Sequence, residues 1–220
     1  MKSFKFRIAA ATLTAALAGP AAAEMELSLY SGVQTLPHSN LSGTHPDVGG
    51  PFSRHVKWNG KSFAAPPYYG ARAMWWRPSN IGWGVEFTHA KAYASDADMN
   101  ALGFSSLEFT DGHNLITVNV MKRWPDRWGG FTPYAGAGLG VAVPHVDATT
   151  TGGSRTYGYQ LTGPAARLTA GAKYDLNDKW AVFGEYQFTY SDNDVDLNGG
   201  GSMKTTLITN ALNFGLSYKF

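Results

Sequence analysis

The chain has no cysteine among its 220 residues, and only 15% of its residues are charged. The absence of cysteine excludes disulfides, thiolate metal ligands and cysteine nucleophiles. The charged fraction is low for a soluble domain, in which about a quarter of the residues are charged. A formal net charge of +2 gives no basic surface for nucleic acid, so no nucleic-acid partner is expected.

Long apolar runs are also missing after Glu24, where no stretch approaches the roughly 20 residues of a membrane-spanning helix. The chain is instead rich in glycine, with 26 residues, and in aromatic residues, at 14%. Aromatic side chains on this scale must be buried, which excludes a disordered chain.

Residues 1–23 have the composition of a secretory signal peptide. Lys2, Lys5 and Arg7 precede an apolar stretch, and a run of alanines ends before Glu24. We predict that this segment is removed, which leaves a slightly acidic chain of residues 24–220 as one domain. A retained membrane anchor is the alternative, but it needs a longer apolar run.

Alternation with period two recurs along residues 24–220 and predicts strands with two different faces. At the C-terminus, Leu212, Phe214 and Leu216 alternate with Asn213 and Gly215, and the chain ends on Phe220. A final aromatic residue after such a strand resembles the terminal signal with which bacterial outer-membrane barrels engage their insertion machinery. On the same basis we predict eight strands, at about 25–34, 67–77, 81–93, 115–124, 131–143, 161–175, 180–190 and 205–220.

The polar residues of these strands share the face opposite the apolar one. An eight-stranded barrel has an interior that side chains just fill, so acids and arginines inside it are expected to form pairs. The residues that we predict to face the interior are Glu26, Arg72, Glu86, Asn119, Arg167, Glu185 and Gln187.

Short and long connections alternate between the predicted strands. The short turns at 77–80, 122–130 and 177–179 have tryptophans beside them, which is typical of the periplasmic interface of a barrel. The long connections at 35–66, 94–114, 144–160 and 191–204 are polar and are expected to be extracellular loops. The tryptophans of the predicted belt are Trp75, Trp76, Trp124, Trp128 and Trp180.

Together these features predict an all-β protein: an eight-stranded antiparallel transmembrane β-barrel of a Gram-negative outer membrane, with a filled lumen and long extracellular loops. A soluble lipocalin-like barrel, apolar inside, is the alternative. The terminal Phe220, the tryptophans and the loop asymmetry disfavour it.

Five of the six histidines lie in or beside the long connections. His89 shares the parity of Trp83, Val85 and Phe87, which predicts a lipid-facing imidazole near the outer interface. In the first long connection, His38, His45 and Asp47 are candidate ligands of a divalent metal of unknown identity. Their spacing matches no tight metal motif, so solvated loop histidines are an equal alternative.

Three blocks in the first half of the chain resemble the outer-membrane lipid A oxidase family. They are ELSLYSGVQTLPHSNLSG at 26–43, WNGKSFAAPPYYGARAMWW at 58–76 and GWGVEFTHAKAYA at 82–94. The second half resembles small outer-membrane barrels in general.

The resemblance implies an oxygen-dependent oxidoreductase. It converts the proximal glucosamine of 1-dephosphorylated lipid A, within lipopolysaccharide of the outer leaflet, to 2-aminogluconate and releases hydrogen peroxide. A bound metal is the economical source of the redox chemistry, and no GxGxxG motif indicates a flavin or nicotinamide cofactor. Under this hypothesis His38, His45 and Asp47 hold the metal, and His89 together with His38 is catalytic, with His89 as the base.

Other functions remain open from the sequence. A structural or surface-interaction barrel of the OmpA or OmpX type would have no activity, and a porin would conduct ions. A barrel that hydrolyses acyl chains is a weaker alternative, because no Ser–His–carboxylate set is evident on the outer wall.

Overall fold

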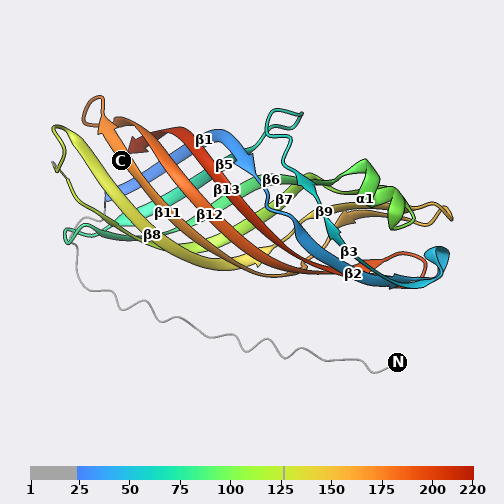
Figure 1. Ribbon diagram of the computed structural model, residues 1–220. Helices are drawn as coiled ribbons and strands as arrows, with labels where there is room; N and C mark the ends of the chain where they lie inside the picture. The colour runs from blue at the N-terminus through green and yellow to red at the C-terminus, as the bar shows by residue number, and fades with distance from the viewer. Residues whose placement is uncertain (1–23, 126) are drawn as a thin grey trace, which may run out of the picture.

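The computed structural model describes residues 24–125 and 127–220, so the predicted signal peptide at 1–23 lies outside the described residues. Eight antiparallel strands form a closed ring (Figure 1), and all eight predicted strands are present. They are β1 (Glu24–Thr35), β5 (Tyr69–Trp76), β6 (Ile81–Ala94), β7 (Phe104–Arg123), β8 (Phe131–Ala142), β11 (Gly163–Asp175), β12 (Trp180–Leu197) and β13 (Gly201–Lys219).

The ring closes where the first strand pairs with the last. Tyr30 of β1 lies opposite Gly215 of β13, and the other side of β1 pairs with β5, where Tyr30 lies opposite Gly70. Closure leaves no unpaired strand edge around the ring, which a bilayer requires of a β-structure. No helix within residues 24–125 and 127–220 is long and apolar enough to cross a membrane.

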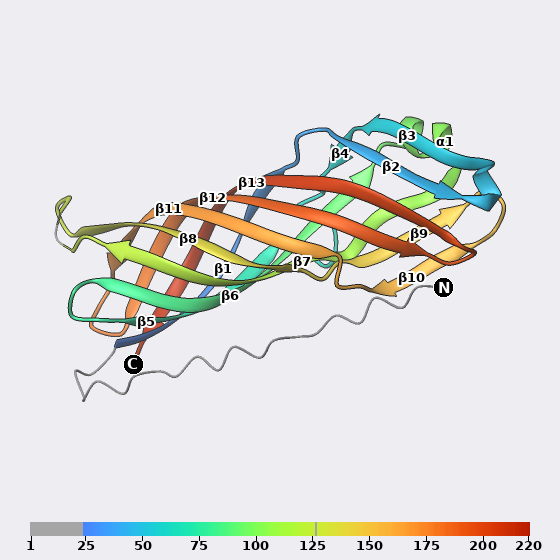
Figure 2. The same ribbon diagram turned by 90° about the horizontal axis from the view of Figure 1, so that it is seen from below.

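The long connections, which we expected to be extracellular loops, contain ordered strands and short helices. β7, β12 and β13 continue beyond the predicted strand ends, and further strands pair with these extensions, as the far end of the molecule in Figure 2 shows. The added elements are β2 (Ser39–His45), the 3₁₀ helix η1 (Pro46–Val48), β3 (Gly50–Val56), β4 (Trp58–Asn59), α1 (Asp96–Ala101), β9 (His145–Thr150) and β10 (Arg155–Tyr159).

A second apolar core explains why these extensions are ordered. Leu41, Val56, Phe104 and Val146 come from four different strands and are fully buried together. Burying such side chains contributes about 1.5–3 kcal/mol each, which offsets the entropy of ordering the connections. The expected loops therefore form a packed sheet that extends the barrel wall.

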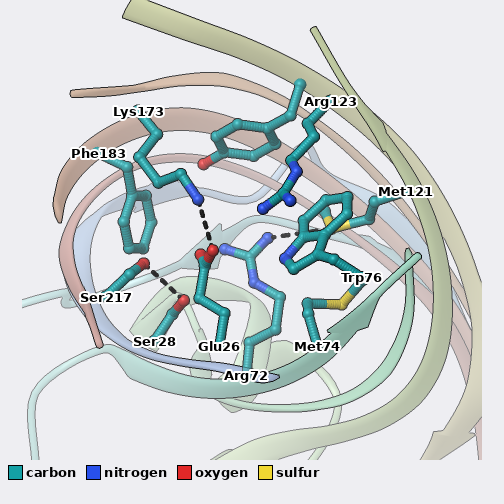
Figure 3. A pocket seen from close by; sticks show the side chains of 11 residues that line it. Glu26, Ser28, Arg72, Met74, Trp76, Met121, Arg123, Lys173, Phe183 and Ser217 are labelled. Carbon is teal, nitrogen blue, oxygen red and sulfur yellow. Dashed lines mark hydrogen bonds and ion pairs between the residues drawn. The ribbon is translucent and has the colours of Figure 1, made fainter. Parts of the chain in front are cut away.

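The lumen is filled, as the parity of the strands predicts. Every polar residue that we predicted to face the interior is at most 5% exposed. Near the short turns, Ser28 and Ser217 share a hydrogen bond of 2.8 Å and Lys173 reaches Glu26 (Figure 3). The cavity there measures about 20 Å³, which has room for about one water molecule.

The charged residues of the lumen form the expected pairs. Glu86 forms an ion pair with Arg167 and accepts hydrogen bonds from Tyr30 at 2.7 Å and Gln187 at 2.9 Å. Arg72 donates to Glu185 over 2.6 Å. Each carboxylate thus meets a cation, which keeps the energetic cost of burying the charges low.

The outer wall is apolar, and its exposed tryptophans lie near the short turns. Trp75 and Trp83 stack there with ring centroids 4.8 Å apart, and Trp128 and Trp180 are exposed. Trp76 departs from the predicted belt, because it points into the lumen and is only 4% exposed. Successive side chains of a strand point to opposite faces, so Trp75 faces outward and Trp76 faces the lumen.

Candidate functional site

His89 lies on the outer wall of β6 at the side that its parity predicts, but lipid does not surround it. The predicted side of the strand is correct, but the side chain is only 4% exposed, because neighbouring residues cover the imidazole where we expected lipid. The ring of Tyr69 stacks on it, with centroids 5.0 Å apart and an interplanar angle of 21°. On the other side the backbone of Gly112 approaches so closely that a Cβ there would lie 2.3 Å from the His89 Nδ1.

The hydrogen bonding of His89 defines its tautomer. Nδ1 donates to the side-chain oxygen of Asn114 over 3.0 Å, since an amide oxygen can only accept. The neutral ring therefore carries its lone pair on Nε2, which is buried and has no hydrogen-bond partner among the described residues. An imidazole held in one tautomer with an unpartnered Nε2 has the form of a general base.

The segment between β4 and β5 helps to bury this region of the wall. Lys91 is two residues above His89 on the same face, and its Nζ donates to the carbonyl oxygens of Ala64 and Ala65, each over 3.0 Å. The lysine is fully buried, so it fixes residues 61–67 against β6.

A second histidine lies on the same side of the wall. His145 of β9 is 5% exposed, and its Nδ1 is 3.7 Å from the carboxylate of Asp111 in β7. Tyr157 and Tyr159 of β10 meet its ring edge-on, at 4.5 and 4.8 Å between centroids, and both tyrosines are more than half exposed. We call the joint surface the rim patch, made of Tyr69, His89, Asp111, Asn114, His145, Tyr157 and Tyr159.

The three predicted metal ligands do not come together. His38 is exposed beside His55 at the start of β2, whereas His45 ends that strand, roughly 23 Å further along an extended chain. Both nitrogens of the His45 ring are engaged, Nε2 with the carbonyl of Asn198 at 2.7 Å and Nδ1 with the backbone N–H of Asp47 at 3.1 Å.

Asp47 forms hydrogen bonds with the turn between β9 and β10. It accepts hydrogen bonds from Ser154 and, over 2.6 Å, from Thr150, and these bonds hold the pKa of its carboxyl below the ordinary value. Across residues 24–125 and 127–220, no group of three or more His, Asp or Glu side chains is arranged to hold a metal ion. The predicted metal set therefore does not fit the arrangement of these residues.

A buried Ser–His contact lies inside the barrel and does not belong to the rim patch. Ser191 and His113 are 2.8 Å apart between Oγ and Nε2, and both side chains are fully buried. This contact faces the lumen, so it does not provide a nucleophile toward lipid.

Sequence reasoning found His89 but missed the residues around it. Tyr69 could have been identified from the sequence, because a hairpin with its turn at residues 77–80 pairs Trp76 with Gly82 and therefore Tyr69 with His89. Asp111 and His145 carried no such signal. Their contact depends on the β7–β9 pairing, which crosses a long connection.

The comparison with protein families decides what kind of barrel this is. Residues 8–220 match the family described as "Outer membrane protein beta-barrel domain". The chain belongs to this family. It is a β-barrel of the bacterial outer membrane, and by the general rule for the class its short turns face the periplasm and its long connections face outward.

Solved structures agree on the fold. The outer membrane protein AlkL is 19% identical to this chain with a TM-score of 0.51, and the match covers 92% of this chain and 92% of AlkL. Neisserial surface protein A is 16% identical with a TM-score of 0.50, over 89% of this chain and 97% of that one. A major outer membrane protein from Thermus thermophilus is 14% identical with a TM-score of 0.50, over 90% of this chain and 100% of that one. No curated protein matches the sequence.

Proposed function

We propose that this barrel is a lipid A oxidase, which oxidises the proximal glucosamine of 1-dephosphorylated lipid A to 2-aminogluconate with dioxygen and releases hydrogen peroxide. The resemblance of residues 26–43, 58–76 and 82–94 to that family is the starting point. Two of these blocks contain the two strands that carry Tyr69 and His89.

The single observation that carries the proposal is the His89 imidazole on the outer wall. Its Nδ1–H is committed to Asn114, and its Nε2 is left as the basic nitrogen at the upper end of the apolar wall. A buried histidine on this face has no role in filling the lumen. The sugars of outer-leaflet lipid A lie at the level of the barrel rim, so a group that acts on them belongs on this surface.

The proposed reaction assigns a proton step to His89. The hydroxyl group at C1 of the hemiacetal gives its proton to Nε2, and the C1–H bond breaks with loss of a hydride equivalent. Dioxygen takes up the two electrons and both protons and becomes hydrogen peroxide. Water then opens the resulting lactone to the acid. Because the ring is only 4% exposed, Tyr69 must turn away to admit the sugar.

Tyr157 and Tyr159 offer a surface for the sugar itself. Their rings are exposed, and aromatic rings with a hydroxyl at one end suit the boundary between lipid and water. His45 and Asp47 are neighbours, with 3.9 Å between Nδ1 and the carboxylate, but His38 is at the other end of β2 and both nitrogens of His45 are engaged. No step of this proposal therefore passes through a metal at those residues.

The test compares lipid A from cells with and without the protein, in a host that supplies the 1-dephosphorylated form. Mass spectrometry is expected to find one additional oxygen on the proximal sugar and, with the purified barrel in detergent, hydrogen peroxide in equal amount. His89→Asn is expected to abolish both, with His55→Asn as the matched histidine control. An unchanged lipid A profile would rule the oxidase out.

A surface-interaction barrel of the OmpA or OmpX type is the second candidate. β10 favours it, because this strand pairs only with β9 among the described strands and exposes Tyr157 and Tyr159. It predicts attachment to a surface or partner that is lost in a Tyr157→Ser, Tyr159→Ser variant while lipid A stays unmodified.

A further inference from the structure

The outer wall carries an apolar groove of about 680 Å³ on the side of the barrel that holds His89. Two small residues of β5 form its floor, Ala71 and Ala73, whereas the strands on either side place large side chains at the same levels. Its walls include Leu27, Leu29, Val85 and Phe87. The groove is therefore a result of the β5 sequence and not of a gap between strands.

The register connects the groove to the rim patch. Leu29, Ala71 and Phe87 lie opposite one another across three strands, and the next outward-facing pair up the wall is Tyr69 with His89. Two residues along a strand span about 7 Å, so the groove begins roughly that far below the Tyr69–His89 stack. At its other end Trp180 and Tyr218 line it, near the short turns.

We propose that this groove binds one acyl chain of the outer-leaflet lipid whose sugar lies against the rim patch. The inference rests on the proposed function for the identity of that lipid as lipid A. A hydrocarbon chain suits the groove because its floor and walls are methyl, branched aliphatic and aromatic groups at the depth of the bilayer core. Its position also has a consequence for catalysis, since a chain held in the groove restricts where the attached sugar lies relative to His89.

Filling the groove tests the proposal. Purified wild-type barrel in detergent, titrated with 1-dephosphorylated lipid A and measured by native mass spectrometry, is expected to retain one lipid. Ala73→Phe is expected to weaken this binding at least tenfold. Ala170→Phe is the matched control, because Ala170 is an exposed alanine of the outer wall on β11 and does not line the groove. Equal binding by all three proteins would overturn the proposal, and so would a dimer that occupies the same wall.

A reversible chemical modification at position 73 tests the groove even if Ala73→Phe fails to fold. Since the chain has no cysteine, Ala73→Cys carries the only thiol, which can be modified in the folded barrel with an alkyl methanethiosulfonate. Lipid retention is expected to fall on modification and to return on reduction, with Ala170→Cys unaffected by either treatment. Retention that does not respond at Ala73 would count against the groove.

These outcomes separate the two proposals. Lipid binding that depends on Ala73, in a barrel that forms no oxidised product, would leave the groove in place and exclude the oxidase. Oxidation that proceeds equally in wild type and Ala73→Phe would retain the oxidase and exclude the groove.

Discussion

The imidazole of His89 and the phenol of Tyr69 are stacked on the outer wall of the barrel, 5.0 Å apart between ring centroids. The two residues are direct cross-strand partners in the β5–β6 hairpin. Cross-strand aromatic pairs stabilise a sheet by about 0.2–1 kcal/mol, so the stack holds the imidazole without making it immovable. This contact gives Tyr69 the position of a cover over the proposed base.

Replacing Tyr69 tests whether it covers His89. Tyr69→Ala is expected to make the imidazole react with diethyl pyrocarbonate at least tenfold faster, as measured by peptide mass spectrometry. Tyr69→Phe keeps the stacked ring and is expected to behave as wild type. His89 labelling at the same rate in all three proteins would show that another group shields the ring.

Gly112 tests the contact on the other side of the imidazole. In Gly112→Ala the new methyl group would lie 2.3 Å from the His89 Nδ1 and 2.4 Å from the Asn114 side-chain oxygen, so their hydrogen bond is expected to break. Gly153→Ala is the control, because that glycine has a similar φ of +103° and nothing within 4 Å of the added Cβ. Oxidation of lipid A is expected to fall at least tenfold only in Gly112→Ala, with loss of the Nδ1–H signal of His89 in NMR spectra.

The membrane-embedded strands were predictable from the sequence because the bilayer imposes a strict alternation. Lipid excludes charge from one face, so Arg72, Glu86 and Arg167 could only point inward. Above the membrane this constraint disappears. Phe104 and Val146 pack against segments far away in the chain, and nothing local distinguishes their strands from loops.

The candidate site was predictable only where it depends on local pairing. The parity of β6 gave the side on which His89 lies, but its burial depends on Gly112, which lies within a register irregularity of the β6–β7 pairing, and on Asn114, which follows it. This irregularity shifts the register by two residues, from Ala90–His113 to Ala92–Phe109, and leaves no pattern in the sequence. His45 and Asp47 are close in sequence, which suggested that they bind one metal ion. In the structure His45 caps the 3₁₀ helix η1, and Asp47 accepts a hydrogen bond from Thr150.

The lumen predicts a large effect for one carboxylate. Glu86→Gln is expected to destabilise the folded barrel by about 3–5 kcal/mol, because Arg167 and Arg72 would remain buried with one counter-charge fewer. Glu24→Gln is the control, since its ion pair with Arg123 lies at the end of the barrel and is partly exposed. It is expected to cost about 1 kcal/mol or less. Equilibrium unfolding in guanidinium chloride, followed by tryptophan fluorescence, measures both, and equal midpoints would contradict the buried network.

Acid is expected to loosen the helix α1 from the sheet above the membrane. Asp98 accepts hydrogen bonds from Ser95 Oγ, the backbone N–H of Lys57 and Arg54 Nε, which together hold its pKa well below the ordinary value. A carboxyl with a lowered pKa stabilises the folded state above the unfolded-state pKa of about 4, and this contribution is lost progressively as the pH falls below it.

Amide hydrogen exchange of residues 96–101, corrected for intrinsic rates, measures this loosening. Protection in the wild type is expected to be constant from pH 7 to about 5 and to fall below about pH 4. Asp98→Asn is expected to lower protection at every pH and to flatten its pH dependence, because the charge that Arg54 and the two hydrogen-bond donors stabilise is absent throughout. Asp96→Asn in the same helix is the control, since Asp96 is exposed, and it should retain the wild-type profile. A wild-type profile in Asp98→Asn would mean that the apolar contacts of the second core, and not this carboxylate, hold α1 in place.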